Sequence, residues 1–522
     1  MAPPAQARTA TGAESAHLVF INARLVGSPT TATYAVEVAD GRVAAMESSE
    51  EYAGPPSTAA VLDLQGAYLA CSVVDSHTHF SSWALAAQRI DLYTALSAAE
   101  VLSRMRAWLP LARSHQPDPS LFLVGQRMRV GEWPDLPDMN RLALDALEPD
   151  RPLAIFFAGF HSLCANSCAL KRLGHKPEGH SGVLEEKECF DAWVEINRIP
   201  EDSVDAAVAQ AALNAAAQGI TEILDLEMAF NIDNWQRRVS KKGIKSLRVR
   251  CGMYRDHLPQ AIAAGYRTGD AVPGTEGLVT VGPHKIITDG SLGSRTACCH
   301  HAYPNEPENF GHLEYKVPTL QSMLEKATAA GMSLAVHAIG DRANQLTLET
   351  FATLNPPALP GSTIEHAQLL STEDIPLFKR LGLIASIQPV HMADDRELAE
   401  QFWPGRTDRA FPFRTIVDAG IPIRMGSDAP VAQVDPWDAM AVAVSRVGRG
   451  QSHLPPWHPE QAITNEQAWL ASTSNGKVSF EVGDRADLIV IPVDPLTASA
   501  EELRKMKVKA TMLGGRWTHF TM

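Results

Sequence analysis

Four stretches of this chain repeat one order of signals, in which a helix is ended by a glycine and followed by a short apolar strand. Ser203 can cap a helix through DAAVAQAALNAAAQ, Gly219 can end it, and the apolar segment ITEILDL follows. The same order recurs around Gly331, where Thr319 opens the helix, and around Gly382 and Gly420. Helices and strands that alternate in this way predict an α/β fold with a parallel sheet.

Eight strands of this kind can be placed along the chain. They are expected at residues 72–79, 220–227, 247–254, 279–288, 332–338, 362–367, 383–389 and 421–428. Eight parallel strands with intervening helices favour a closed (β/α)8 TIM-like barrel. An open, doubly wound sheet is the alternative, but it would leave the first and eighth strands far apart. Closure of the sheet brings those two strands together.

The two ends of the chain carry short strands of another kind. HLVFINARLV and YAVEVADGRVAAMES, with a turn at Asp40-Gly41, alternate between apolar and polar residues, and VGDRADLIVIPVD and VKATMLGGRWTHF do the same near the C-terminus. Neither end can bury a core alone. Together they predict a small β-sandwich formed by residues 17–71 and 475–522.

This leaves residues 72–474 for the barrel, with a long insertion at about 80–200 after the first barrel strand. Residues 1–16 are rich in Ala, Pro and Thr and are expected to form a disordered tail.

Side chains suited to metal binding and proton transfer stand where the predicted barrel strands end. His77 and His79 are separated by one residue, so on a strand both imidazoles point to the same face. Neutral imidazole is a common ligand for divalent metals, although such a pair also fits a half-exposed strand without a metal. Later strands add four residues, and in a closed barrel all six meet at the carboxyl ends of the strands. These four are Lys285, His337, His366 and Asp428.

Several longer motifs surround these residues. They are HTH on the first strand, HKIITDGSLGSRTA around the fourth, VHAIGDRA after the fifth, IEHAQ at the sixth, SIQPVH at the seventh and MGSDAPV at the eighth. Together they resemble the amidohydrolase superfamily, and within it the amidohydrolase-3, YtcJ-like branch, which includes N-substituted formamide deformylases. The resemblance extends from about residue 17 to the end of the chain. One stretch, ACSVVDSHTH, stands where the family usually has a proline and a glycine ahead of the apolar pair.

The resemblance implies a site for one or two divalent ions, with Zn²⁺ as the expected metal. The implied ligands are His77 and His79 for one ion, His337 and His366 for a second, and Lys285 as a carboxylated bridge. A lysine carbamate requires the neutral amine, and burial in an apolar strand lowers the pKa of lysine towards that form. On the residues alone, an ordinary ion pair between Lys285 and Asp289 is equally open.

The expected chemistry is hydrolysis of a carbon–nitrogen bond in a small molecule, of amide or formamide type but not a peptide bond. Divalent metals lower the pKa of bound water from about 15.7 to about 7, which provides hydroxide at neutral pH. Asp428 would accept the proton of that water and pass it to the leaving nitrogen, since the amine must leave protonated. A simpler interpretation of Asp428 is a turn carboxylate ahead of Pro430.

Candidate substrate contacts come from separate parts of the chain. FHSLCANSCAL resembles the family pattern DGHSAxxNSxAL with a glycine, Gly159, in place of the usual aspartate. Each of the candidates also has a structural interpretation. They are His161 and Asn166 in that motif, together with Trp83, Arg295, Gln388 and His391.

Composition fits a cytoplasmic enzyme without nucleic-acid or membrane partners. The 522 residues are 45% hydrophobic, and the formal net charge of −14 argues against binding to nucleic acid or an anionic membrane. The chain has no signal-peptide pattern and no apolar run long enough to span a bilayer. The 7 cysteines lack paired CxxC spacing, which fits reduced thiols. A homodimer is a candidate assembly.

Two alternatives share the barrel but differ in function. One is a metal-dependent barrel enzyme with non-hydrolytic chemistry, a decarboxylase or an isomerase, because a fold does not determine its reaction. The other is a non-catalytic regulatory protein built on the same scaffold. Release of amine and acid from N-acyl and N-formyl compounds would separate hydrolysis from both.

Overall fold

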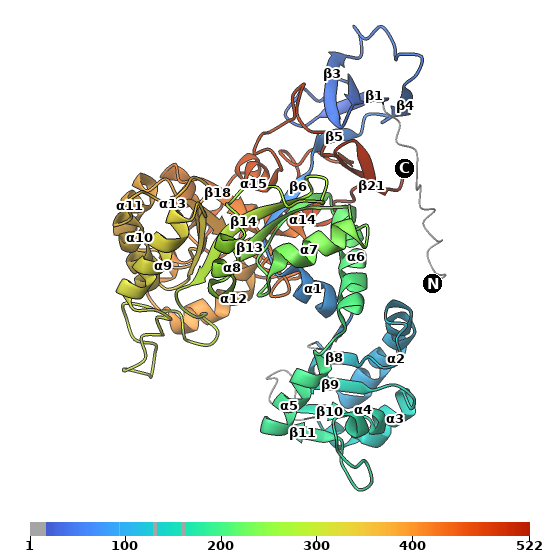
Figure 1. Ribbon diagram of the computed structural model, residues 1–522, viewed down its shortest axis with the longest axis vertical. Coiled ribbons are helices and arrows are strands. Elements are labelled where there is room, and N and C mark those ends of the chain that lie inside the picture. Colours follow the sequence, from blue (N-terminus) through green and yellow to red (C-terminus); the bar gives the residue numbers. More distant parts are fainter. Residues whose placement is uncertain (1–16, 93, 129–132, 158–161) are drawn as a thin grey trace. The chain divides into compact units, whose positions relative to one another are not determined.

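The computed structural model describes residues 17–92, 94–128, 133–157 and 162–522. The tail expected at residues 1–16 and the candidate His161 lie outside these ranges. The chain divides into two compact units, which are residues 1–79 with 212–522, and residues 80–211. Figure 1 shows the elements of both units.

The first unit contains a barrel of eight parallel strands, and every predicted strand is present. In the order of hydrogen bonding from β18 back to β6, each strand pairs in parallel with the next one. The strands are β6 (Val73–Thr78), β12 (Ile220–Asp225), β13 (Arg248–Met253), β14 (Val279–Ile287), β15 (Leu334–Ala338), β16 (Thr363–His366), β17 (Ile384–Ile387) and β18 (Ile423–Met425).

The residues after β18 close the barrel against β6. The backbone N–H of Asp428 donates to the carbonyl of His77 at 2.7 Å, and that of His79 donates to Ala429 at 2.8 Å. Thr78 and Ala429 form a parallel bridge. The predicted closed barrel is therefore confirmed, and the open sheet is wrong.

Helices follow most barrel strands, and the four predicted stop glycines end the helices before β12, β15, β17 and β18. Gly219, Gly331, Gly382 and Gly420 have φ of 87°, 78°, 65° and 75°, a conformation that glycine adopts without strain. The helices of this region are α6 (Glu201–Ala217), α7 (Asn231–Ser240), α8 (Leu258–Ala263), α9 (Val317–Ala329), α10 (Asp341–Ala352), α11 (Ile375–Arg380), α12 (Pro389–Phe402), α13 (Phe413–Asp418), α14 (Pro436–Ser445), α15 (Asn465–Ser472) and α16 (Ala500–Arg504).

The predicted helix starts are late, since α6 begins at Glu201, before the predicted cap Ser203, and α9 begins at Val317, before Thr319. A proline lies just before the first helical residue of α6 and inside the first turn of α9. The fixed φ of proline suits the beginning of a helix and moves the start ahead of the hydroxyl residue.

The strands of both chain ends form one continuous sheet in the order β21-β20-β19-β5-β1-β2-β3, with β4 paired to β1. The two ends meet where β5 pairs antiparallel with β19, with Cys71 opposite Leu488. Only Ser72 separates β5 from the first barrel strand. The strands are β1 (His17–Leu25), β2 (Tyr34–Ala39), β3 (Arg42–Ser48), β4 (Ala60–Asp63), β5 (Tyr68–Cys71), β19 (Leu488–Ile491), β20 (Ala510–Leu513) and β21 (Arg516–Phe520).

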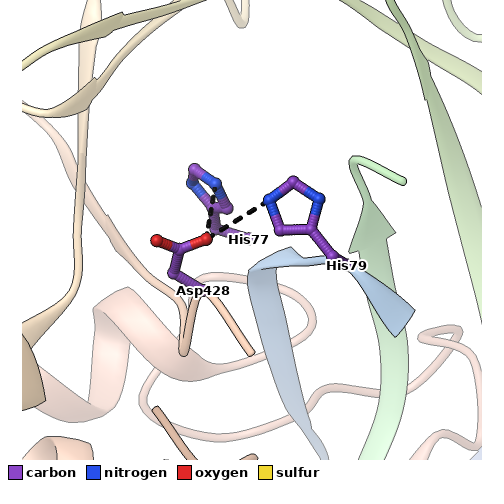
Figure 2. Close-up of side chains that lie close together, drawn as sticks. All are labelled: His77, His79 and Asp428. Atoms are coloured by element: carbon purple, nitrogen blue, oxygen red, sulfur yellow. Dashed lines mark ion pairs between the residues drawn. The ribbon is translucent and has the colours of Figure 1, made fainter. Parts of the chain in front are cut away.

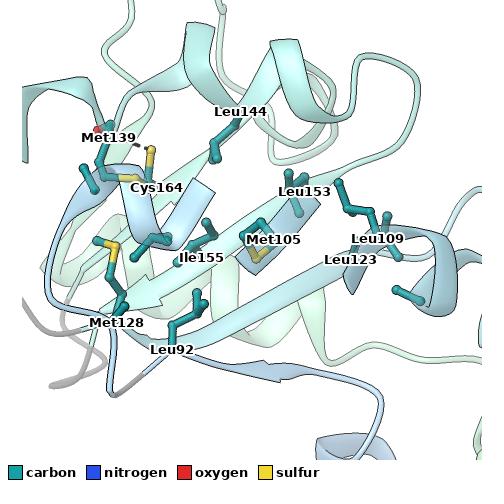
Figure 3. Packing of buried hydrophobic residues seen from close by; sticks show 14 residues of the cluster. Leu92, Met105, Leu109, Leu123, Met128, Met139, Leu144, Leu153, Ile155 and Cys164 are labelled. Atoms are coloured by element: carbon teal, nitrogen blue, oxygen red, sulfur yellow. Dashed lines mark hydrogen bonds between the residues drawn. The ribbon is translucent and has the colours of Figure 1, made fainter. Parts of the chain in front are cut away.

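The second unit has its own five-stranded sheet, in the order β11-β10-β9-β8-β7. Alternate residues of β9 face two different cores: Leu153 and Ile155 join a cluster with α2, which Figure 3 shows, and Ala154 and Phe156 join one with α4 and α5. The elements are α1 (Phe80–Ala86), β7 (Ile90–Asp91), α2 (Ala98–His115), β8 (Leu123–Met128), α3 (Arg141–Leu147), β9 (Leu153–Phe157), β10 (Ser162–Ala165), α4 (Ser167–Arg172), β11 (Val183–Glu185) and α5 (Glu186–Ile196).

Within the described ranges, no helix combines the length and the apolar character that crossing a membrane requires.

Candidate metal centre

Two histidines at the end of β6 point at one carboxylate. The Nε2 atoms of His77 and His79 lie 3.3 Å and 3.4 Å from Oδ1 of Asp428. Figure 2 shows these three side chains and the ion pairs between them. His77 is buried and His79 is partly exposed. The spacing of two residues on a strand gives both side chains the same direction, as the sequence predicts.

A second pair of histidines lies on the other side of the same carboxylate. Nε2 of His391 is 3.8 Å from Oδ2 of Asp428, and the ring of His391 stacks on that of His366 with the centroids 5.9 Å apart. In each of the two triads, His77–His79–Asp428 and His366–His391–Asp428, the potential ligand atoms lie within 4.8 Å of one another. Asp428 is therefore shared by two groups of imidazoles.

The backbone at this site adopts conformations that L-residues rarely use. Asp428 has φ of 56° and His366 has φ of 72°. Such residues cost about 1–3 kcal/mol each and persist only where the surrounding structure holds them. A third constraint is Gly426, where an added Cβ would lie 2.5 Å from the backbone nitrogen of His77. The first and eighth strands thus meet closely, and this contact sets the place of Asp428.

Lys285 is buried on β14 with Nζ 3.4 Å from Nε2 of His77. Burial lowers the pKa of Lys285 towards the neutral amine. Within the described ranges, Lys285 makes no ion pair, and the carboxylate of Asp289 has other partners. The Asp289 carboxylate accepts hydrogen bonds from the backbone N–H groups of Cys298, Ile339 and Gly340. The ion-pair interpretation of Lys285 is therefore not supported.

His337, at the end of β15, lies beside the cluster but in neither triad. Its ring centroid is 4.5 Å from that of His366. Its Nε2 atom lies 3.4 Å from Oδ1 of Asp289 and 3.3 Å from the carbonyl oxygen of Gly290. The structure thus brings His337 next to the other imidazoles while its Nε2 atom contacts the loop after β14.

The charges at this centre are arranged to attract a cation. Burial would raise the pKa of Asp428, but His77 and the surrounding histidines lower it well below its usual range. For His77 and His366, burial is the largest influence and lowers the pKa, while the charge of Asp428 opposes that shift. Neutral imidazoles around an ionised carboxylate are a donor set suited to a divalent metal.

Two nitrogen atoms of the cluster support this assignment directly. Nδ1 of His366 and Nε2 of His391 are buried, and neither has a hydrogen-bond partner in the described part of the chain. A buried polar atom without a partner costs about 1–3 kcal/mol. A bound cation would satisfy such atoms, so the residues present fit a metal.

Sequence reasoning missed Glu365, which is fully buried next to His366. Oε2 of Glu365 lies 2.6 Å from Nδ1 of His77, and its other oxygen accepts a hydrogen bond from the hydroxyl of Thr363. Burial opposes ionisation of Glu365, but the charge of His77 and their hydrogen bond hold its pKa at about 2. The signal available was an acidic residue inside the apolar strand of the IEHAQ motif.

Tyr254, directly after β13, was also missed. Its hydroxyl is buried without a hydrogen-bond partner among the described residues, and burial raises the pKa of Tyr254. The charge of Asp428 raises this pKa further. A single tyrosine after a strand gives no distinct sequence signal.

Of the predicted substrate contacts, Gln388 and His391 lie in the cluster. Nε2 of Gln388 is 3.3 Å from Nδ1 of His77, and His391 belongs to the second triad. Arg295 is half-exposed, pairs with Glu306 at 3.2 Å and lies over the ring of Phe402.

The two substrate-contact candidates in the second unit, Asn166 and Trp83, make contacts that stabilise the fold of that unit. The side-chain oxygen of Asn166 accepts from the backbone N–H groups of Leu153 and Ala169, and its NH₂ group donates to two backbone carbonyls. Because this uses the hydrogen-bonding capacity of the amide, Asn166 caps α4 and anchors β9. Trp83 is buried in α1, with its ring 5.3 Å from that of Phe80.

A closed parallel barrel with histidines and an aspartate gathered at its carboxyl end defines a class of metal-dependent hydrolases. The sequence matches the family model described as "Amidohydrolase family" over residues 60–519. The chain belongs to the amidohydrolase family, which supports hydrolase activity.

The relatives match along almost the whole chain. The putative amidohydrolase YtcJ of Bacillus subtilis (strain 168) is 27% identical and covers 93% of this chain and 95% of its own length. The N-substituted formamide deformylase of Arthrobacter pascens is 24% identical, and the match covers 95% of this chain and 97% of the deformylase. The structure of an uncharacterized metal-dependent hydrolase from Pyrococcus horikoshii OT3 shares the fold, with a TM-score of 0.73, 23% identity, and coverage of 93% of this chain and 99% of that one.

Proposed function

We propose that this protein hydrolyses a carbon–nitrogen bond of amide or formamide type, other than a peptide bond, in a small molecule. The observation that carries the proposal is the ionised carboxylate of Asp428 between two groups of imidazoles. The name of the Arthrobacter pascens relative, an N-substituted formamide deformylase, points to the same class of bond.

The proposed metal ligands are the residues gathered around Asp428. His77 and His79 would hold one divalent ion, His337 and His366 would hold a second, and Lys285 would join them as a carbamate. We propose zinc, because the donors are neutral imidazoles with a carboxylate. A divalent metal bound here would supply an activated water and polarise the scissile carbonyl. His391 shares the second triad and is a further candidate ligand.

Asp428 is proposed as the proton carrier of the reaction. Its carboxylate is ionised and can accept a proton at an oxygen atom from the attacking water. The same oxygen can return that proton to the leaving nitrogen, so that a neutral amine departs. The backbone bond from Asp428 to His77 holds the carboxylate in place between the histidines.

Glu365 orients His77, and burial of Lys285 favours the form of its amine from which the proposed carbamate can be made. Because Glu365 is ionised, it accepts the Nδ1–H of His77, which leaves the lone pair of this imidazole on Nε2, facing Asp428 and Lys285. The buried amine of Lys285 is held towards its neutral form, which can add to carbon dioxide with loss of a proton. Gln388 lies beside His77 and is proposed to contact substrate.

A substrate panel tests this function. Metal-loaded protein is incubated with N-formyl and N-acyl amines, and both the free amine and the acid are measured; a chelator-treated sample is the control. The proposal expects stoichiometric release of both products by the loaded enzyme alone. Folded, metal-loaded protein that releases carbon dioxide or an isomer, or that turns over no acyl compound, would contradict it.

A further inference from the structure

A cavity of about 200 Å³ lies at the amino-terminal end of the barrel. Its lining includes Thr280, Thr363 and Arg424, which stand at or near the beginning of β14, β16 and β18, and Ser333, which directly precedes β15. The candidate metal residues stand at the other end of the same strands. The cavity is therefore separate from the site described above. At about 30 Å³ per water molecule, it has room for roughly six waters or a small solute.

Two guanidinium groups line this cavity, and only one of them has a partner. Nε of Arg250 lies 2.8 Å from Oε1 of Glu222. Arg424 is partly buried and, within the described ranges, its guanidinium group makes neither an ion pair nor a hydrogen bond. Burial, together with the charge of Arg250, lowers the pKa of Arg424, while the charges of Glu365 and Glu222 oppose this shift. One positive charge at the cavity is left without a contacting counterion.

A partly buried charge without a contacting counterion costs free energy unless a bound ion or solvent compensates it. The formal net charge of the chain is −14, so a surplus of positive charge here does not follow from composition. Two neutral hydroxyl residues, Thr268 and Ser333, also line the cavity. The hydroxyl of Thr268 donates to the carbonyl of Gly282 at 2.8 Å and accepts from the N–H of Ser333 at 3.0 Å.

We propose that this amino-terminal cavity is a binding site for a small oxyanion, held by the guanidinium groups of Arg250 and Arg424. The planar fork of a guanidinium matches the oxygens of a carboxylate, phosphate or sulfate group. The occupant neutralises Arg424 and replaces water in the cavity. This site uses neither the histidines nor Asp428, and Thr363 of its lining donates a hydrogen bond to Glu365.

Titration calorimetry of the full-length protein tests the proposal, with sulfate and acetate as probes at constant ionic strength against chloride. Wild-type protein should bind at least one probe at a single site. Arg424→Gln should weaken that binding at least tenfold. Arg414→Gln is the matched control, because Arg414 is half-exposed on α13 and pairs with Asp418, and it should bind as wild type does.

Stability measurements separate loss of the site from loss of the fold. In chloride, Arg424→Gln should have a Tm at or above that of wild type, since it removes a partly buried charge that has no contacting counterion. Sulfate should raise the Tm of wild type by more degrees than that of Arg424→Gln. Arg424→Lys, which keeps the charge but not the fork, should bind with intermediate affinity.

Three results would overturn the assignment. Neither sulfate nor acetate binds wild-type protein, or both bind Arg424→Gln as tightly as wild type. The third is loss of binding in His79→Ala, which would place the anion at the candidate metal centre instead.

Discussion

At the scale of single residues, the candidate site depends on side chains that the strand pattern could only partly reveal. His77, His79 and Asp428 were predictable because each stands at the end of an apolar run. Glu365 was not, since strict alternation along β16 gives Glu365 and His366 opposite faces. The φ of 72° at His366 breaks that alternation and allows both residues to approach His77. A conformation of this kind is imposed by tertiary contacts, so the acidic residue inside the apolar strand could be noticed in the sequence but not placed beside His77.

Asp428→Asn should keep the metal and lose most of the turnover. The amide has nearly the same shape as the carboxylate but cannot carry a proton, and positioned proton transfer contributes about 10²–10⁴-fold to rate. Steady-state kinetics and metal analysis on one preparation check this, with Asp418→Asn on the exposed side of α13 as the control. A loaded Asp428→Asn enzyme with normal kcat would remove this aspartate from the mechanism.

Glu365→Gln should weaken metal binding by about 10–100-fold, because His77 loses the anion that orients its ring. Competition with a metal chelator measures the affinity, and circular dichroism verifies the fold. The exposed Glu349→Gln on α10 is the control. Unchanged affinity in Glu365→Gln would show that His77 is not a ligand.

At the scale of elements, the barrel was predictable because each helix–glycine–strand unit is encoded by residues that are close together in the sequence. Glycine with positive φ ends the helix, and the apolar run that follows can only be buried. The helix starts were less exact, because prolines at α6 and α9 favour an earlier start than the hydroxyl residues do. Closure between β6 and the segment after β18 joins residues about 350 positions apart, and only the strand count indicated it.

Gly426→Ala should destabilise the protein by about 1–3 kcal/mol and lower its metal affinity. The new methyl group would lie 2.5 Å from the backbone nitrogen of His77 and push apart the strands that hold His77 and Asp428. Chemical denaturation and metal titration measure the two effects. Gly293→Ala, whose methyl group would make only an ordinary contact at 3.7 Å, is the control. Equal stability of both variants would contradict the close approach.

At the scale of the whole molecule, the chain contains two units with separate cores. The sequence indicated an insertion after the first barrel strand but not its architecture, because its strands are short and mixed in direction. The sheet of the chain ends was predictable in outline, since four alternating segments have no other partners. How β1 pairs with both β4 and β5 follows from tertiary packing rather than from any local signal.

Met105→Ala should loosen the second unit while leaving the barrel strands protected. Met105 is fully buried in the core between α2 and the sheet (Figure 3), and large-to-small changes of this kind cost about 2–5 kcal/mol. Hydrogen exchange read out along β8, β9, β14 and β15 distinguishes the two units. Equal loss of protection in all four strands would show that the chain unfolds as one cooperative body.

The central claim is that imidazoles and a carboxylate from distant parts of the chain bind metal at one end of the barrel. Anomalous X-ray scattering at the zinc edge, on crystals of the zinc-loaded protein, tests it most directly. The account predicts a peak at about 2.0–2.2 Å from nitrogen atoms of His77 and His79 and an oxygen of Asp428, with a second position beside His366. Zinc bound only at other residues, or none at all in folded protein, would contradict it.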